Sequence, residues 1–138
     1  DRRSEDVAAR VQALTEGRGA DVVYDPVGGD AFREATRCIA HEGRLLAVGF
    51  ASGSWGKVDV AQLVTRNYSV VGVIPSHYDR AFKESAQAEL LRLWREGRLG
   101  VRVDELVPFD KLPDALERLL ASGVQGKLAL AVRGDATR

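Results

Sequence analysis

Apolar positions along the first hundred residues switch between two spacings, and the switching predicts strands and helices in turn. Short continuous apolar runs occur at Val22–Tyr24, Leu45–Val48 and Ser69–Ile74. Such runs are typical of strands in a parallel sheet that is covered on both faces. Between them, apolar side chains recur three or four positions apart, which predicts helices. This strict β-α-β-α-β-α order favours a parallel α/β sheet with right-handed crossovers.

Polar and glycine residues predict where these helices begin and end. The spacing of Val7 to Leu14 indicates an opening helix, which the glycines around Arg18 end. The longest helix is expected to run to about Glu96, where Gly97 ends it. A turn at Glu42-Gly43 is expected before the second strand. The residues that we expect to cap the helices are Ser4, Asp30, Asp79 and Asp110.

The last third of the chain has a different order of elements. A strand is predicted over Val103–Phe109, then a helix that Gly123 ends, then a final apolar strand over Lys127–Val132. No linker or repeat separates this part from the rest. One domain is therefore the simplest interpretation, and the alternative is that the last strand pair belongs to a neighbouring module.

Composition excludes several classes of protein. The 138 residues hold 20 Lys and Arg against 20 Asp and Glu. This balance gives no electrostatic reason to expect nucleic acid or an anionic membrane as partner. No apolar run approaches the roughly 20 residues of a membrane span. The single Cys38 excludes an internal disulfide, which favours a reducing compartment, and the cytoplasm is the expected location.

Two glycine-containing loops follow the first two predicted strands. One is Asp25-Pro26-Val27-Gly28-Gly29, and the other is Val48-Gly49-Phe50-Ala51-Ser52-Gly53. Ligands of open α/β sheets bind outside the carboxyl ends of the strands, and glycine lets the backbone approach them closely. The alternative for either loop alone is an ordinary tight turn. Because both loops fall on one edge, the pair favours a nucleotide-type crevice.

Other chemical signals are weak. Neither G-x-G-x-x-G nor a P-loop occurs, so we do not expect this chain to bind a dinucleotide on its own. His41 and His77 stand apart from other metal-binding residues, and we predict no metal site and no catalytic residue. Cys38 is expected to pack in a helix. The apolar strand Ser69–Ile74 is expected at the sheet edge, which suggests a homodimer joined through it.

The order of these motifs resembles one family. The resemblance rests on Gly17–Gly29, Gly43–Gly53, Ser69–Val73 and Gly126–Leu130, and it covers nearly the whole chain. These residues look like the C-terminal part of the medium-chain dehydrogenase/reductase superfamily, in the zinc-independent quinone oxidoreductase branch. The resemblance implies that residues 1–100 are the second half of a Rossmann-type sheet with flanking helices. Residues 101–138 would be a strand-helix-strand segment returning to a catalytic domain.

The resemblance also implies a cofactor, a substrate class and a site. The cofactor would be NADPH, with NADH possible, and the substrate a quinone or an activated alkene such as an enone. The phosphate-binding glycine turn would precede this chain, which would then be incomplete alone. The residues implied to line the cofactor are Gly28, Gly29, Gly49, Phe50, Ala51, Ser52, Ile74, Pro75, Ser76 and Lys127. The rival hypotheses are a non-enzymatic dimerisation module and a distinct α/β fold with a partial nucleotide crevice.

Overall fold

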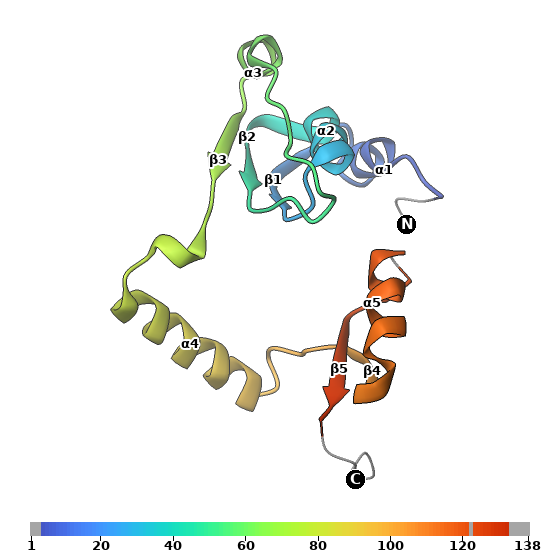
Figure 1. Ribbon diagram of the computed structural model, residues 1–138. Coiled ribbons are helices and arrows are strands. Elements are labelled where there is room, and N and C mark those ends of the chain that lie inside the picture. The colour runs from blue at the N-terminus through green and yellow to red at the C-terminus, as the bar shows by residue number, and fades with distance from the viewer. Residues whose placement is uncertain (1–3, 122, 133–138) are drawn as a thin grey trace. The chain divides into compact units, whose positions relative to one another are not determined.

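The computed structural model describes residues 4–121 and 123–132, and the chain forms two compact units, Asp1–Asp79 and Arg80–Arg138. Figure 1 shows the elements in chain order. The first unit contains α1 (Val7–Leu14), β1 (Ala20–Asp25), α2 (Gly29–Cys38), β2 (Ile39–Ala47), α3 (Val60–Arg66), β3 (Ser69–Gly72) and the 3-10 helix η1 (Pro75–His77). The second contains α4 (Arg80–Arg95), β4 (Val103–Pro108), the 3-10 helix η2 (Phe109–Lys111), α5 (Leu112–Leu120) and β5 (Lys127–Ala131).

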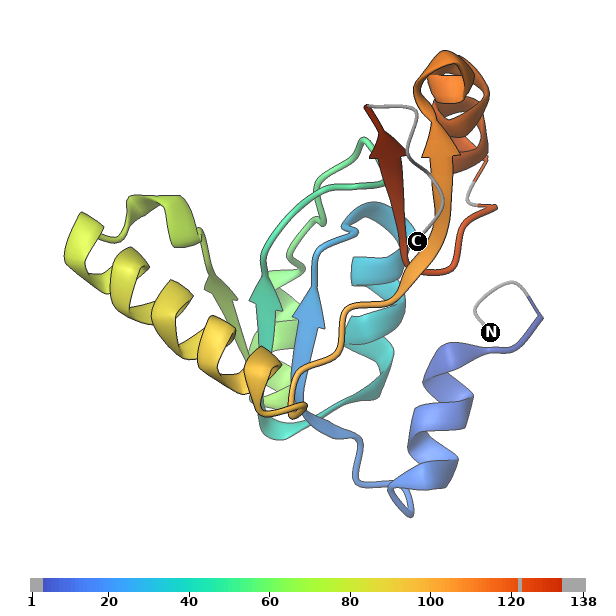
Figure 2. The same cartoon turned by 90° about the horizontal axis from the view of Figure 1, so that it is seen from below.

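The three strands of the first unit form one parallel sheet in the order β1-β2-β3, as the sequence predicts. Val23 pairs with Leu45, and Leu45 pairs with Val70 across the next ladder. Figure 2 shows the three arrows pointing the same way. The α/β fold class and the parallel sheet are confirmed.

Helices cover one face of this sheet. Successive crossovers that step in the same direction place their helices on the same side, because each crossover is right-handed. Phe32 of α2 and Leu45 of β2 are buried in one cluster, against which Leu63 of α3 packs. On the opposite face Val22 and Tyr24 are exposed. Within the first unit the helices therefore lie on one face of the sheet, and the expected cover on the other face stays a prediction.

Several element boundaries differ from the predicted ones. The Asp6 carboxylate, rather than Ser4, accepts the Ala9 amide at the start of α1. Asp30 lies inside α2, because Gly28 takes the capping position with φ of +72°. Asp110 falls inside η2, and α5 begins after Lys111.

The second and third strands also differ in extent. The expected turn at Glu42 is a distortion inside the longer strand β2, where Glu42 has φ of +58° and its amide donates to the Asn67 carbonyl at 2.7 Å. The third strand ends at Gly72 rather than at Ile74. It is still an edge strand of the described sheet.

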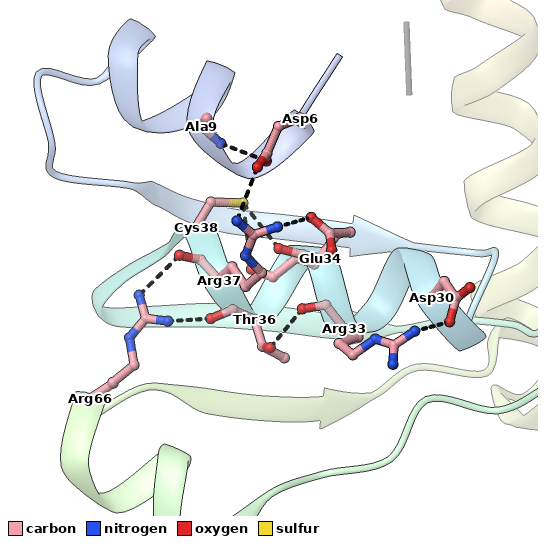
Figure 3. Close-up of polar contacts among 10 residues, drawn as sticks. Asp6, Ala9, Asp30, Arg33, Glu34, Thr36, Arg37, Cys38 and Arg66 are labelled. Atoms are coloured by element: carbon pink, nitrogen blue, oxygen red, sulfur yellow. Dashed lines mark hydrogen bonds and ion pairs between the residues drawn. The ribbon is translucent and has the colours of Figure 1, made fainter. Parts of the chain in front are cut away.

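Arg66, the last residue of α3, holds the C-terminal end of α2. Its guanidinium donates to the carbonyl of Thr36, and at 3.3 Å to those of Arg37 and Ile39. Figure 3 shows the guanidinium at the end of the helix. The last carbonyls of a helix have no partner within it, so this arginine satisfies groups that would otherwise be unpaired. The junction between α2 and β2 is thereby fixed.

An ion-pair cluster on the outer side of α2 joins it to α1. The Arg37 guanidinium contacts Asp6 at 3.0 Å and Glu34 at 2.6 Å (Figure 3). The Ala9 amide and this guanidinium lower the pKa of the Asp6 carboxyl below its ordinary value. The cluster therefore favours the charged form of Asp6 at the N-terminus of α1, where negative charge is stabilising.

The second unit is built around a two-stranded parallel sheet. Val107 of β4 pairs with Leu130 of β5, and Val107 and Ala115 are its buried apolar side chains. No residue of α4 is buried. Among the described residues, none of the helices is long and apolar enough to cross a membrane. The polar residues 133–138 of the expected C-terminal segment lie outside the described part.

Candidate functional site: two loops at the carboxyl edge of the sheet

The loops that follow β1 and β2 are joined by backbone hydrogen bonds. The amides of Val48 and Gly49 donate to the Asp25 carbonyl at 2.9 and 3.3 Å. The Ala51 amide donates to the Pro26 carbonyl at 3.1 Å, and the Ser52 amide to the Val27 carbonyl at 2.9 Å. The predicted adjacency of the two loops is confirmed. They form one surface at the edge where ligands of such sheets bind.

Three glycines of these loops, Gly28, Gly29 and Gly49, are needed for packing between the loops. A Cβ at Gly28 would overlap the Ser54 carbonyl oxygen, and one at Gly49 would lie 2.9 Å from the Pro26 carbonyl oxygen. A Cβ at Gly29 would lie 2.9 Å from the Ser52 hydroxyl oxygen. The sequence leaves two alternatives for these glycines, close approach of a ligand or the positive φ of a tight turn. The positive φ of Gly28 and Gly29 agrees with the tight turn, and close approach of one loop to the other is a further reason for glycine. Close approach of a ligand stays a prediction.

The second loop presents its side chains outward. Phe50, Ala51 and Ser52 are exposed. The ring of Phe50 lies against that of Trp55, with centroids 4.3 Å apart and planes tilted by 31°. The Ser52 hydroxyl donates to the Ser54 carbonyl at 3.2 Å, which tightens the loop. This part of the site therefore offers two exposed aromatic rings and a hydroxyl.

The remaining predicted site residues fall in two places. Ile74 to Ser76 follow β3 at the same carboxyl edge, and the Val73 amide donates to the Ala47 carbonyl at 3.0 Å. All three are exposed. Lys127 begins β5 in the second unit, where its amide donates to the Arg102 carbonyl at 2.9 Å. Its expected place near the cofactor ring stays a prediction.

Two residues of the site are absent from the predicted set. Asp25 is only 5% exposed, and its carboxylate accepts amides of the first loop. An aspartate that ends an apolar strand before Pro-x-Gly is the signal that points to this turn. The Trp55 ring lies against that of Phe50. The sequence feature that could have identified Trp55 is a large aromatic residue within a loop otherwise rich in glycine and serine.

Two titratable side chains near the sheet, those of Cys38 and His41, contact other groups of the protein. Burial raises the pKa of the Cys38 thiol, whose sulfur lies 3.5 Å from the Ala35 carbonyl oxygen. This agrees with the packing role expected from the sequence, since reactive cysteines have lowered pKa values. His41 Nε2 lies 3.1 Å from the side-chain nitrogen of Asn67. Across the described ranges, His, Cys, Asp and Glu form no group of three or more that could hold a metal ion.

The chain resembles known proteins over most of its length. Residues 1–130 match the family described as zinc-binding dehydrogenase. The chain is 31% identical over 131 residues to a quinone oxidoreductase-like protein 2 homolog of Nematostella vectensis, covering 91% of this chain and 36% of that protein. It is 31% identical over 129 residues to a quinone oxidoreductase of Pseudomonas aeruginosa, covering 91% of this chain and 40% of that one.

A solved structure agrees with these matches. The quinone oxidoreductase of Escherichia coli complexed with NADPH superposes with a TM-score of 0.81 at 28% identity. The match covers 94% of this chain and 41% of that one. The chain thus spans well under half the length of the relatives that it matches. The resemblance to quinone oxidoreductases drawn from the sequence is confirmed.

Proposed function

The chain belongs to the family of zinc-binding dehydrogenases, and from this membership we propose that it supplies part of the cofactor domain of an oxidoreductase. The cofactor is NADPH, with NADH as the alternative, and the substrate is a quinone or an activated alkene such as an enone. The hydrogen-bonded pair of loops after β1 and β2 carries this proposal. The similar Escherichia coli enzyme was solved with NADPH, which supports the choice of cofactor.

The described residues suit the nicotinamide end of such a cofactor. The bound cofactor would supply a hydride, and the chain's residues would orient its ring. Gly28, Gly29 and Gly49 keep the two loops in contact, while Phe50, Ala51 and Ser52 are exposed beside them. Ile74, Pro75 and Ser76 extend the same edge. Lys127 belongs to the second unit, and its place in the proposed set rests on the family resemblance alone. Orientation of the cofactor is the protein's main contribution in enzymes of this kind.

The described residues do not suit the metal in the family's description. The structure brings together no group of three metal-binding side chains in residues 4–121 and 123–132. The Cys38 sulfur is buried against helix carbonyls. We assign no metal to these residues, and the zinc-independent branch stays a proposal that rests on the family resemblance.

Binding of NADPH to the isolated chain tests the proposal. We expect weak binding, because no glycine-rich phosphate turn is present, and a dissociation constant below about 1 μM would contradict the proposed incompleteness. Ala51→Glu should weaken binding, since it adds bulk and negative charge beside an anionic ligand. The matched control is Ala13→Glu, because Ala13 is exposed on α1. Equal NADPH titrations for both variants would contradict the proposed site.

A homodimer through β3 is a further part of the proposal. In the described sheet β3 has a strand on one side only, and Val71 is 39% exposed. Exposed apolar edge strands favour pairing with another chain. We expect a dimer in light scattering and a shift to monomer in Val71→Lys. A wild-type chain that stays monomeric at high concentration would contradict this assembly.

The same edge supports the second candidate function, a non-enzymatic dimerisation module. A dimer that binds neither NADPH nor NADH would favour that candidate over the oxidoreductase. The sequence upstream of Asp1 separates the two as well, since a glycine-rich strand-turn-helix there would favour the enzyme. A cytoplasmic location is proposed in either case, supported by the free cysteine Cys38.

A further inference from the structure

Asp25, the last residue of β1, has a buried carboxylate that the proposed cofactor contacts do not use. Asp25 and Thr36 are the buried polar residues among those that the structure describes. Burial of a carboxylate is costly unless the group is hydrogen-bonded. Here the Asp25 Oδ1 accepts the Val27 amide at 2.9 Å and the Gly28 amide at 3.0 Å. The carboxylate therefore holds the first loop from inside.

The main chain of the same residue holds the second loop. The Asp25 carbonyl oxygen accepts the amides of Val48 and Gly49. The next two residues continue the contacts between the loops. The Pro26 carbonyl accepts the Ala51 amide, and the Val27 carbonyl accepts the Ser52 amide. One residue thus joins both loops, with its side chain on one and its carbonyl on the other. Rotation of Asp25 would disturb both sets of bonds.

The turn that the carboxylate holds is conformationally demanding. Gly28 has φ of +72° and ψ of −162°, a region that is essentially restricted to glycine. The chain needs local hydrogen bonds to keep such a residue in one conformation. The Gly28 amide bonds to Asp25, and the Gly28 carbonyl accepts the Ala31 amide at 3.1 Å in the first turn of α2. The carboxylate is the acceptor that lies before the turn.

From these contacts we propose that Asp25 is a positioning residue for cofactor binding, acting through the two loops rather than touching the ligand. This inference rests on the proposed function. Its carboxylate fixes the turn over residues 26–29, which in turn fixes Phe50, Ala51 and Ser52 through the hydrogen bonds between the loops. Loss of the carboxylate would leave β1 paired but would let the loops move.

Three variants test this role. Asp25→Ala removes the acceptor and leaves two amides without a partner, while Asp25→Asn keeps an oxygen of the same shape without the charge. Thr36→Val is the matched control. Thr36 is similarly buried at 7% exposure, but its hydroxyl donates to the Arg33 carbonyl within α2. A general loss of stability would affect all three variants, whereas a positioning role separates them.

The first measurement is amide hydrogen exchange. In Asp25→Ala we expect at least tenfold faster exchange at Val48, Gly49, Ala51 and Ser52, with protection at Leu45 and Leu46 retained. Asp25→Asn should show an intermediate increase. Thr36→Val should leave the exchange of the four loop amides within twofold of wild type. Unchanged loop exchange in a folded Asp25→Ala chain would overturn the proposal.

The second measurement is NADPH affinity, followed by tryptophan fluorescence. Every chain carries Trp94→Phe, so that Trp55 is the single tryptophan and reports on the site. Asp25→Ala should raise the dissociation constant at least tenfold, Asp25→Asn less, and Thr36→Val under twofold. Equal affinity for Asp25→Ala and wild type would overturn the proposal. If wild type itself binds no NADPH, the proposed function fails for this chain, and the exchange result alone decides whether Asp25 positions the loops.

Discussion

Helices α2 and α4 both carry apolar residues at helical spacing, but they differ in burial. In α2 the buried side chains are those of Phe32, Ala35, Thr36 and Cys38. The longer helix α4 has no buried residue, and Leu90, Leu91 and Trp94 are exposed on it. Periodic apolar positions thus predict that a helix forms, but they do not show what covers it. The comparison therefore contrasts two sources of helix stability. In α2 it comes from packing of buried side chains, and in α4 from interactions within the helix.

Different contacts hold the two helices. The sheet and Arg66 hold α2, whereas α4 carries surface ion pairs such as those of Arg92 with Glu89 and Glu96, both at 2.6 Å. Exposed ion pairs of this kind contribute little to stability, because water and salt screen them. Substitutions in the first unit should therefore cost much more than equivalent substitutions on α4.

The largest effect is expected for Leu45→Ala. Leu45 has no exposed surface and lies in the cluster between the sheet and α2. Truncation of such a leucine creates a cavity and should lower the free energy of unfolding by about 3 kcal/mol. Urea unfolding of a Trp94→Phe chain, followed by Trp55 fluorescence, measures it in the first unit. A cost below about 1 kcal/mol would contradict the core described for this unit.

The fold of the first unit was largely predictable, and its details show where local pattern stops being sufficient. The runs around Val23, Leu45 and Val70 predict a parallel sheet because continuous apolar strands suit that environment. The positive φ of Glu42 was not predictable, since it depends on a hydrogen bond to Asn67 from a distant element. Tertiary contacts of this kind leave no local signature.

The candidate site was predictable to the same degree. Two glycine loops after consecutive parallel strands must meet at one edge, so their adjacency follows from the order of elements. What holds them does not follow from that order. Whether Asp25 is buried or solvated depends on the tertiary structure around it, and the reason for Gly28 lies in the position of the Ser54 carbonyl. The family resemblance supplied the ligand, which the residues alone did not.

The next effect in size is expected for Gly28→Ala. The new Cβ would overlap the Ser54 carbonyl oxygen in a backbone region that favours glycine, and we expect a cost of about 2 kcal/mol. Gly53→Ala is the matched control in the second loop, because Gly53 has φ of +83° but no atom within 4 Å of its would-be Cβ. It should cost about 1 kcal/mol, from backbone strain alone. Equal unfolding free energies for both variants would mean that contact between the loops contributes nothing.

A smaller effect is expected for Arg66→Ala. The substitution leaves the last carbonyls of α2 without their guanidinium donor, and the expected cost is about 1.5 kcal/mol. Arg66→Lys keeps the charge but loses the planar fork, so it should recover only part of this free energy. Thermal unfolding followed by circular dichroism measures both. Full recovery by lysine would show that charge, rather than the geometry of the fork, stabilises the end of α2.

The smallest effect is expected for Leu90→Ala on α4, the same chemical change as in Leu45→Ala. Leu90 is 48% exposed, and alanine favours a helix at least as well as leucine, so the cost should stay within about 0.5 kcal/mol. Trp94 fluorescence in a Trp55→Phe chain follows the second unit during urea unfolding. A cost near that of Leu45→Ala would show that the apolar side of α4 is covered in solution. Helix α4 would then depend on packing as α2 does, and the contrast between the two helices would fail.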